Sequence, residues 1–264
     1  MDRNIQIMGI LNLTPDSFSD GGCWNNDSAL SARIDQLLTE GVDIIDVGGE
    51  STRPFAQAVS ADMELARVLP AIRMIRERSA VSLSIDTTKA VVAREALAAG
   101  ATMVNDISAL RHDPEMVDVI RSYQGPVIIM HMQGDPGDMQ VRPCYEDVVA
   151  EINGFFAERL GWLERQGVDR DRIIVDPGIG FGKTLEHNLA ILRNIQAFKQ
   201  HGCPVLIGHS RKSFLGQLLD VPVAERDCPT ALVSAFCALR GADILRVHEV
   251  RGTRQAVLLM QALS

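Results

Sequence analysis

The chain has 264 residues, of which 46% are hydrophobic, and it carries a net charge of −8. About 250 residues is the usual size of one (β/α)8 domain, so we expect a single domain over residues 1–264. The acidic balance and the lack of a Lys/Arg-rich run exclude a general nucleic-acid surface. Any anionic ligand must therefore be held by a few local cations.

The cysteines and the first residues favour a cytoplasmic location. The five cysteines are scattered, odd in number and without C-x-x-C spacing, a pattern typical of reduced thiols. The first residues lack the basic and apolar regions of a signal peptide, and no apolar run reaches the ~18 residues that span a bilayer. We expect no membrane segment.

Eight apolar, β-branched runs recur along the chain, and an amphipathic helical pattern follows each one. In chain order these predicted strands span residues 5–13, 42–47, 81–86, 102–107, 127–131, 173–176, 205–208 and 244–248. Each strand ends on a polar or charged side chain: Asn12, Asp46, Asp86, Asn105, His131, Asp176, His209 and the pair Arg246/His248.

Strict alternation of strands and helices fits two α/β folds, a closed (β/α)8 barrel and a doubly wound open sheet. The open sheet typically carries a Gly-rich dinucleotide turn after its first strand, but Thr14-Pro15-Asp16-Ser17-Phe18 follows here. Eight strands and this turn favour a single (β/α)8 TIM barrel. The carboxyl ends of barrel strands converge on one mouth, so all eight polar ends are predicted to form one site.

The segment from Asp176 to Thr184, with the sequence DPGIGFGKT, resembles a phosphate-binding P-loop. The spacing fails, because the position that such a loop reserves for glycine is Pro177, which has no N–H to offer. Three glycines instead predict a tight turn that a flat ligand can approach. Asp176 is suited to ring N–H and NH2 donors, and a role as a simple helix cap is the alternative.

Cationic residues follow the last two predicted strands. The run Gly208-His209-Ser210-Arg211-Lys212-Ser213 opens a helix at a place where barrels often bind phosphate or carboxylate. Arg246 and His248 are two residues apart on a strand, so both cationic side chains are predicted to point the same way. This pattern favours an anion clamp, and a solvated charge cluster is the alternative.

The remaining polar strand ends allow more than one interpretation. The amides of Asn12 and Asn105 suit a heterocycle edge or an oxygen-coordinated metal. Asp86 either binds a ligand or starts a helix, and Asp46 with Glu50 either joins the site or pairs with Arg53. The histidines lack the spacing of a metal centre, and no Gly-x-Ser-x-Gly elbow is present.

Taken in order, these motifs resemble the dihydropteroate synthase family of pterin-binding barrels over nearly the whole chain. The resemblance rests on residues 9–22, 46–54, 84–87, 105–107, 176–183, 210–213 and 246–248. It implies an enzyme of folate biosynthesis that condenses 6-hydroxymethyl-7,8-dihydropterin diphosphate with 4-aminobenzoate, giving 7,8-dihydropteroate and diphosphate. It also implies Mg2+ as cofactor, a homodimer, and a target of sulfonamides.

The same resemblance implies a role for each matching residue. The pterin would be bound by Asp86, Asn105, Asp176 and Lys212. The diphosphate would be bound by Asn12, Arg246 and His248, with Asn12 also on Mg2+. The 4-aminobenzoate pocket would be formed by Phe18, Thr52, Arg53, Pro54, Phe181, Lys212 and Ser213. The catalytic set would be Lys212, Arg246, His248 and Asp86.

The implied reaction fits these residue types. A leaving diphosphate needs positive charge where negative charge develops, which Arg246, His248 and Mg2+ supply. The aniline nitrogen of 4-aminobenzoate is neutral at about pH 7, so no strong base is needed. We predict a dissociative reaction, in which the methylene cation forms before the amine adds.

Two residues depart from the family pattern, and two other functions compete. Phe55 stands where the family commonly has glycine, which predicts altered sulfonamide contacts, and His209 stands where relatives often have an apolar or small residue. A pterin-dependent methyltransferase would not need residues 14–20 or 210–213. A non-catalytic pterin-binding protein would not need Lys212, Arg246 and His248.

Overall fold

The computed structural model describes residues 5–14, 27–51, 59–134, 139 and 141–264. Its strands are β1 (Gln6–Asn12), β2 (Ile44–Gly48), β3 (Ser82–Asp86), β4 (Met103–Asp106), β5 (Val127–Met130), β6 (Ile173–Asp176), β7 (Leu206–Ile207) and β8 (Ile244–Val247). All pair in parallel in the order β6-β5-β4-β3-β2-β1-β8-β7. A parallel bridge between Val175 and Val205 joins the two end strands. The sheet is therefore the closed TIM barrel that the sequence predicts.

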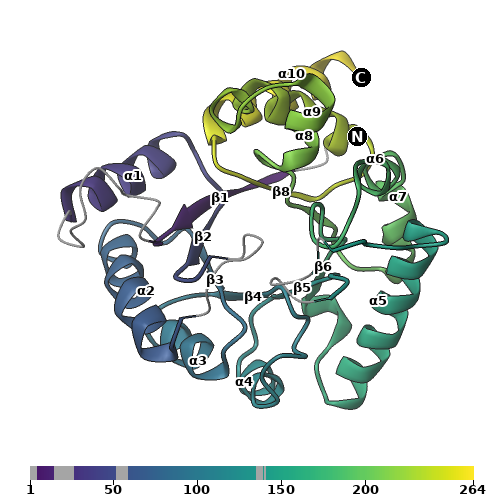
Figure 1. Cartoon of the computed structure of the whole chain (residues 1–264). Coiled ribbons are helices and arrows are strands. Elements are labelled where there is room, and N and C mark those ends of the chain that lie inside the picture. Colours follow the sequence, from purple (N-terminus) through teal and green to yellow (C-terminus); the bar gives the residue numbers. More distant parts are fainter. Residues whose placement is uncertain (1–4, 15–26, 52–58, 135–138, 140) are drawn as a thin grey trace.

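Helices form a ring around this barrel (Figure 1). They are α1 (Asp27–Thr39), α2 (Ala61–Arg76), α3 (Ala90–Ala98), α4 (Met116–Ser122), α5 (Val148–Arg165), α6 (Leu185–Arg193), α7 (Ile195–Phe198), α8 (Ser213–Leu219), α9 (Asp227–Leu239) and α10 (Val250–Leu263). Short 3-10 turns span Arg170–Arg172, Lys199–His201 and Val223–Glu225. Within the described residues, no helix is long and apolar enough to cross a membrane.

Amphipathic spacing explains how the helices cover the sheet. In α5 the buried side chains include Ile152, Phe156, Leu160 and Leu163, which recur every three or four residues and so share one face. The carboxylate of Asp147 accepts the N–H groups of the first turn of α5 and so caps that helix. The buried stripe packs toward the sheet and leaves the polar face in solvent.

The barrel interior begins with one apolar layer to which seven of the eight strands contribute. Its members are Met8, Ile44, Met103, Ile128, Ile174, Leu206 and Ile244. Side chains alternate along a strand, so the residue two positions later also faces the barrel axis, one level nearer the mouth. Those residues are Ile10, Asp46, Asn105, Met130, Asp176, Gly208 and Arg246. The register places Asp86 directly beside Asn105 and Gly48.

The same alternation shows that the expectation of eight converging polar ends is wrong for two strands. His209 follows the inward Gly208 and therefore points outward, where its Nε2 lies 2.9 Å from Oγ of Ser234 on α9. His131 follows the inward Met130, and its ring meets that of Phe155 on α5 edge-on at 5.0 Å. Both histidines join the sheet to a covering helix rather than face the mouth.

Candidate active site

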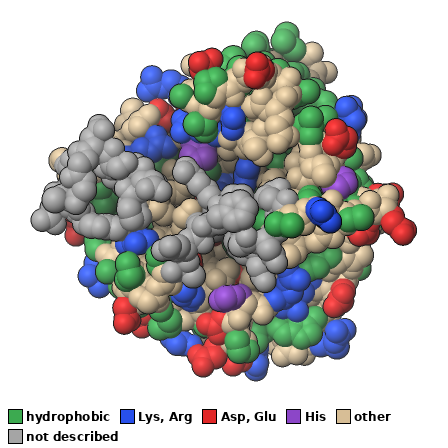
Figure 2. Space-filling view, in the orientation of Figure 1, with side chains coloured by type: hydrophobic (Ala, Val, Ile, Leu, Met, Phe, Trp, Pro, Cys, Tyr) green, Lys and Arg blue, Asp and Glu red, His purple; other side chains and the backbone are tan. Residues whose placement is uncertain are grey.

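Buried polar side chains gather at the carboxyl ends of the strands, at the mouth that Figure 2 views from outside. Asp46, Asp86, Asn105 and Asp176 come from four different strands, and each is at most 9% exposed. Their β-strand positions follow from the register of the barrel. Charged groups buried in this way need partners, because desolvation strongly disfavours an unpaired charge.

Arg246 of β8 provides the main counter-charge. Its Nε donates to Oδ2 of Asp46 at 2.6 Å, and its Nη2 donates to Oδ2 of Asp86 at 2.7 Å. Burial alone would lower the pKa of this guanidinium, but the two carboxylates raise it above its ordinary value. Burial raises the pKa of Asp86 to about 7, although Arg246 opposes the shift. Arg246 thus stays charged, while Asp86 titrates near neutral pH.

The structure separates the two interpretations of Asp86. The N-cap of α3 is Lys89, whereas Asp86 ends β3 and binds Arg246. Gly48 beside it has no side chain, and a methyl group there would lie 3.5 Å from Oδ1 of Asn12 and 3.6 Å from Cβ of Asp86. Asn12 and Asp86 therefore flank one small gap at the mouth.

Asp46 and Glu50 have separate partners. Oδ2 of Asp46 accepts hydrogen bonds from Arg246 and, at 3.3 Å, from Nδ2 of Asn105. Glu50 forms an ion pair with Lys89. The predicted alternative of pairing with Arg53 involves a residue outside the described ranges. Asp46 belongs to the mouth, and Glu50 does not join its hydrogen bonds to Arg246.

Asp176 ends β6 and starts the glycine-rich turn. Its Oδ1 accepts the N–H of Gly178 at 2.8 Å, whereas α6 is capped by Thr184, so the helix-cap alternative for Asp176 is wrong. Burial raises the pKa of Asp176 to about 6. Gly178 has φ +70°, and a methyl group there would approach the carbonyl oxygen of His131 to 2.0 Å. Only glycine permits this close approach.

Lys212 lies beside this turn. Its Nζ is 4.0 Å from the centroid of the Phe181 ring, a cation–π contact. Burial, together with the charge of Arg246, lowers the pKa of Lys212 to about 8. A methyl group on Gly180 would lie 3.1 Å from Cδ of Lys212. The predicted ligand residues Phe181 and Lys212 are thus brought together, and the exposed Ser213 follows as the first residue of α8.

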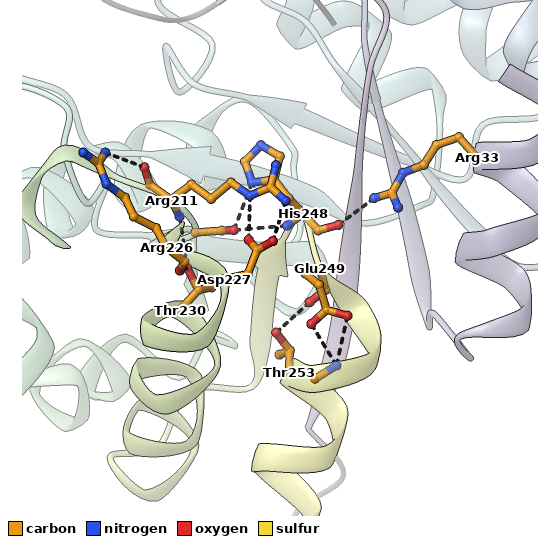
Figure 3. A network of polar contacts seen from close by, with 10 residues as sticks. Arg33, Arg211, Arg226, Asp227, Thr230, His248, Glu249 and Thr253 are labelled. Atoms are coloured by element: carbon orange, nitrogen blue, oxygen red, sulfur yellow. Dashed lines mark hydrogen bonds and ion pairs between the residues drawn. The ribbon is translucent and has the colours of Figure 1, made fainter. Parts of the chain in front are cut away.

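His248 is held by hydrogen bonds at the end of β8 (Figure 3). Its Nδ1 lies 2.9 Å from Oγ of Ser210, and its carbonyl oxygen accepts from Arg33 of α1 at 2.6 Å. Burial, with the charges of Arg211 and Arg246, lowers the pKa of His248 to about 3. Burial beside two arginines thus favours the neutral ring, and the role of His248 on the diphosphate stays a prediction.

Arg211 pairs with helix α9 rather than with a carboxylate of the strand ends. Its guanidinium makes a two-point ion pair with Asp227 of α9, at 2.6 and 2.7 Å. The backbone of Arg211 is left-handed, with φ 56°, and its N–H donates to Oγ1 of Thr230 at 3.1 Å. Arg226 donates to the carbonyl oxygen of Arg211 at 3.2 Å. Figure 3 shows this network, which holds the turn that directly precedes Lys212.

Lys183 is a buried contact that the sequence pattern did not reveal. It is 4% exposed, and its Nζ donates to the carbonyl oxygen of Phe181 at 2.9 Å and lies 3.1 Å from Nδ1 of His131. Burial lowers the pKa of Lys183 to about 7. Lys183 thus connects the glycine-rich turn to the residue that follows β5. The one sequence feature that hints at this contact is a lysine directly after the glycine-rich turn.

Four of the predicted 4-aminobenzoate residues lie outside the described residues: Phe18, Thr52, Arg53 and Pro54. Phe55 lies outside them as well. Within the described ranges, no group of three His, Cys, Asp or Glu side chains is arranged to hold a metal ion.

The donor set at the mouth nevertheless suits Mg2+. This ion usually keeps several waters and binds through one or two protein oxygens plus substrate phosphates, rather than in an all-protein cage. Oδ1 of Asn12 and Oδ2 of Asp86 lie 3.5 and 3.8 Å from one point above Gly48. Asn12 therefore offers a neutral oxygen close to a carboxylate.

Comparison with known proteins agrees with this site. A family model described as pterin binding enzyme matches residues 8–248. The dihydropteroate synthase of Escherichia coli (strain K12) is 43% identical over 256 residues, which cover 97% of this chain and 90% of that protein. The chain therefore belongs to the family of pterin-binding enzymes.

Solved structures similar to this chain identify which pterin-binding enzyme it resembles. The Yersinia pestis dihydropteroate synthase, in a sulfonamide drug complex, superposes with a TM-score of 0.94 at 42% identity, covering 98% of this chain and 94% of that one. The Xanthomonas albilineans enzyme in complex with 7,8-dihydropteroate gives 0.89 at 40% identity, covering 99% and 94%. The activity of this chain is that of dihydropteroate synthase, an enzyme of folate biosynthesis.

Proposed function

We propose that the barrel mouth binds 6-hydroxymethyl-7,8-dihydropterin diphosphate and 4-aminobenzoate and joins them into 7,8-dihydropteroate. The observation that carries this proposal is the ion pair of the partly exposed Arg246 with the buried Asp86, beside Asp176 and Lys212. Carboxylates suit the N–H and NH2 edge of a pterin, and the guanidinium suits its diphosphate. Asp86, Asn105, Asp176 and Lys212 would bind the ring.

The proposed reaction breaks the bond between the pterin methylene carbon and the diphosphate oxygen, and the electron pair leaves with diphosphate. The aniline nitrogen then bonds to the methylene carbon and loses its proton to water. Arg246 and His248 would hold the leaving diphosphate by hydrogen bonds, and Arg246 would stabilise its developing charge. No described residue has to act as a strong base in this sequence.

Mg2+ and the second substrate complete the proposal. Asn12 would contribute an amide oxygen to Mg2+, which when bound neutralises charge on the diphosphate. Phe181 and Ser213 would line the 4-aminobenzoate pocket with Phe18, Thr52, Arg53 and Pro54. These roles follow from the family membership together with the positions of Phe181 and Lys212.

Pterin affinity should rise between about pH 5 and about pH 8, because Asp176 and Asp86 must be ionised to accept from the ring. The pKa values of these two carboxyls are raised to about 6 and about 7. Their neutral forms are favoured by folding, so their contribution to stability is lost as pH rises through those values. Fluorescence titration of a pterin across this range measures the affinity. A flat or falling affinity would contradict the assignment.

We also propose that the protein is a homodimer formed through α8, α9 and α10. Eight of the eleven large hydrophobic side chains that are exposed within the described residues lie between residues 218 and 263. Three of them, Leu218, Leu219 and Leu232, line a groove of about 280 Å³ that also includes Phe236. Contiguous exposed apolar surface of this kind marks interaction sites, and a second copy offers the matching surface by symmetry.

Sedimentation equilibrium tests the dimer. We expect a mass of about 58 kDa, twice the chain's 28.9 kDa. Leu232→Asp, at a side chain that is 66% exposed, should give a folded monomer, while Met63→Asp on α2 should remain dimeric. A monomeric wild-type protein would contradict the proposal.

The proposed reaction is tested by measuring diphosphate release from the purified protein. Release should require both substrates and should match dihydropteroate formation one to one. Release without product would indicate hydrolysis. Tight pterin binding without any diphosphate release would indicate a binding protein. Either of these two results would overturn the proposal.

A further inference from the structure

Asp46 has no role in the proposed reaction, yet it binds two residues that do. It lies on β2 and has no exposed surface. Its Oδ2 accepts from Nε of Arg246 at 2.6 Å and from Nδ2 of Asn105 at 3.3 Å. One buried oxygen thus connects a residue proposed to hold the diphosphate with a residue proposed to hold the pterin.

The depth of the contacts gives Arg246 a fixed end and an accessible end. The side chain of Asp46, which binds Nε, is 0% exposed, whereas that of Asp86, which binds Nη2, is 9% exposed. The Arg246 side chain itself is 19% exposed. The Nη2 side of the guanidinium thus faces the more exposed of its two carboxylate partners, and Nε faces the fully buried one.

Packing stability alone does not explain a carboxylate at this position. Oδ1 of Asp46 is buried and lacks a hydrogen-bond partner within the described part of the chain. An incompletely satisfied buried carboxylate disfavours folding, and buried ion pairs are often no more stable than apolar packing. The charge at residue 46 is better explained by what it does to Arg246.

We propose that Asp46 is a positioning residue that anchors Nε of Arg246, so that Nη2 can move between Asp86 and the leaving diphosphate. This inference rests on the proposed function. When the substrate enters, Nη2 turns from Asp86 to the anion, which frees Oδ2 of Asp86 for the pterin ring. Asp46 keeps the guanidinium at the mouth during this exchange and does not itself touch the substrate.

Loss of the charge on Asp46 should have two opposing effects. Removal of a negative charge favours an incoming anion, because it reduces the Coulomb repulsion between the site and that anion. It also leaves Asp86 as the carboxylate in direct contact with Arg246, and a guanidinium facing one carboxylate tends to form a two-point pair. That pair would occupy the pterin anchor and the diphosphate donor at once, so we expect the net effect to be weaker binding.

Asp46→Asn tests the proposal, because it keeps the shape and removes the charge. We expect the KM for pterin diphosphate and the Kd for inorganic diphosphate to rise about tenfold or more, with the KM for 4-aminobenzoate within about twofold. Asp43→Asn is the matched control. Asp43 precedes the same strand at the opposite end of the barrel and pairs with Arg254 at 2.7 Å, and its loss should alter stability only.

The pH profile separates positioning from a structural role. Asp86 faces the charges of Arg246, Asp46, Glu64 and Asp106, and the charge of Asp46 helps to raise its pKa. In Asp46→Asn the acid limb of pterin affinity should move to lower pH, and in Asp43→Asn it should stay in place. Calorimetry with inorganic diphosphate needs no turnover, so it tests Asp46 even if the wild-type protein proves inactive. Unchanged or tighter diphosphate binding, or a loss equal to that of the control, overturns the proposal.

Discussion

Arg246→Met should lower kcat/KM about 10³-fold, because it removes the charge that faces the leaving diphosphate. The substitution also leaves Asp46 and Asp86 as buried carboxylates without their shared partner. Breaking a buried pair from one side typically destabilises a protein by about 3–5 kcal/mol. Steady-state kinetics and thermal unfolding of the same preparation measure the two effects.

Arg246→Lys distinguishes catalysis from folding. Lysine retains the charge but lacks the planar fork that binds Asp46 and Asp86 together. We expect it to regain most of the lost stability while kcat/KM stays at least about tenfold below wild type. Wild-type turnover in either variant would show that this guanidinium does not act in the reaction.

Asp176→Asn should raise the KM for pterin diphosphate about 100-fold, which corresponds to ~3 kcal/mol. The amide oxygen of the variant still accepts from the N–H of Gly178, so the turn after β6 should keep its shape. What is lost is the charged acceptor for the ring N–H and NH2 donors. The KM for 4-aminobenzoate should change little, because Phe181 and Lys212 stay in place.

Asp106→Asn is the matched control for this second variant. Asp106 is equally buried at the end of β4, but its carboxylate accepts the N–H groups of Ser108 at 2.7 Å and Leu110 at 3.1 Å. Its loss should reduce stability while leaving the KM for pterin diphosphate unchanged. An equal rise of KM in both variants would mean that Asp176 acts through folding alone.

The barrel could be predicted from the sequence because burial on both faces of a parallel strand leaves a continuous apolar run. The predicted end of β6 at Asp176 is confirmed, whereas β7 is only Leu206–Ile207 rather than residues 205–208. Val205 pairs with Val175 only through an isolated bridge, so the apolar run extends beyond the strand itself. Element type was therefore better predicted than element length.

Alternation along each strand decides which polar residues face the barrel mouth, and this alternation can be read from the sequence. Asp46, Asp176 and Arg246 each lie two residues after a side chain of the inner apolar layer, whereas His131 and His209 lie three residues after one. Alternation along a strand sends the first group inward and the second outward. This parity could have excluded both histidines without a structure.

The electrostatics of the site could not be predicted in the same way. The lowered pKa of His248 depends on its burial and on Arg211, which the turn after β7 brings near the ring of this β8 residue. The role of Lys183 depends on the carbonyl oxygen of Phe181 and the ring of His131 meeting at one point. Such contacts arise from tertiary packing and leave no spacing pattern in the sequence.

A crystal structure of the protein with 6-hydroxymethyl-7,8-dihydropterin diphosphate and Mg2+ tests the central claim most directly. We predict that the N–H and NH2 edge of the ring lies on Asp86, Asn105 and Asp176, with the diphosphate on Arg246 and His248. In this complex Nη2 of Arg246 should have left Asp86, while Nε should still bind Asp46. A pterin bound away from these strand ends, or a diphosphate that does not contact Arg246, would contradict the assignment of this mouth as the active site.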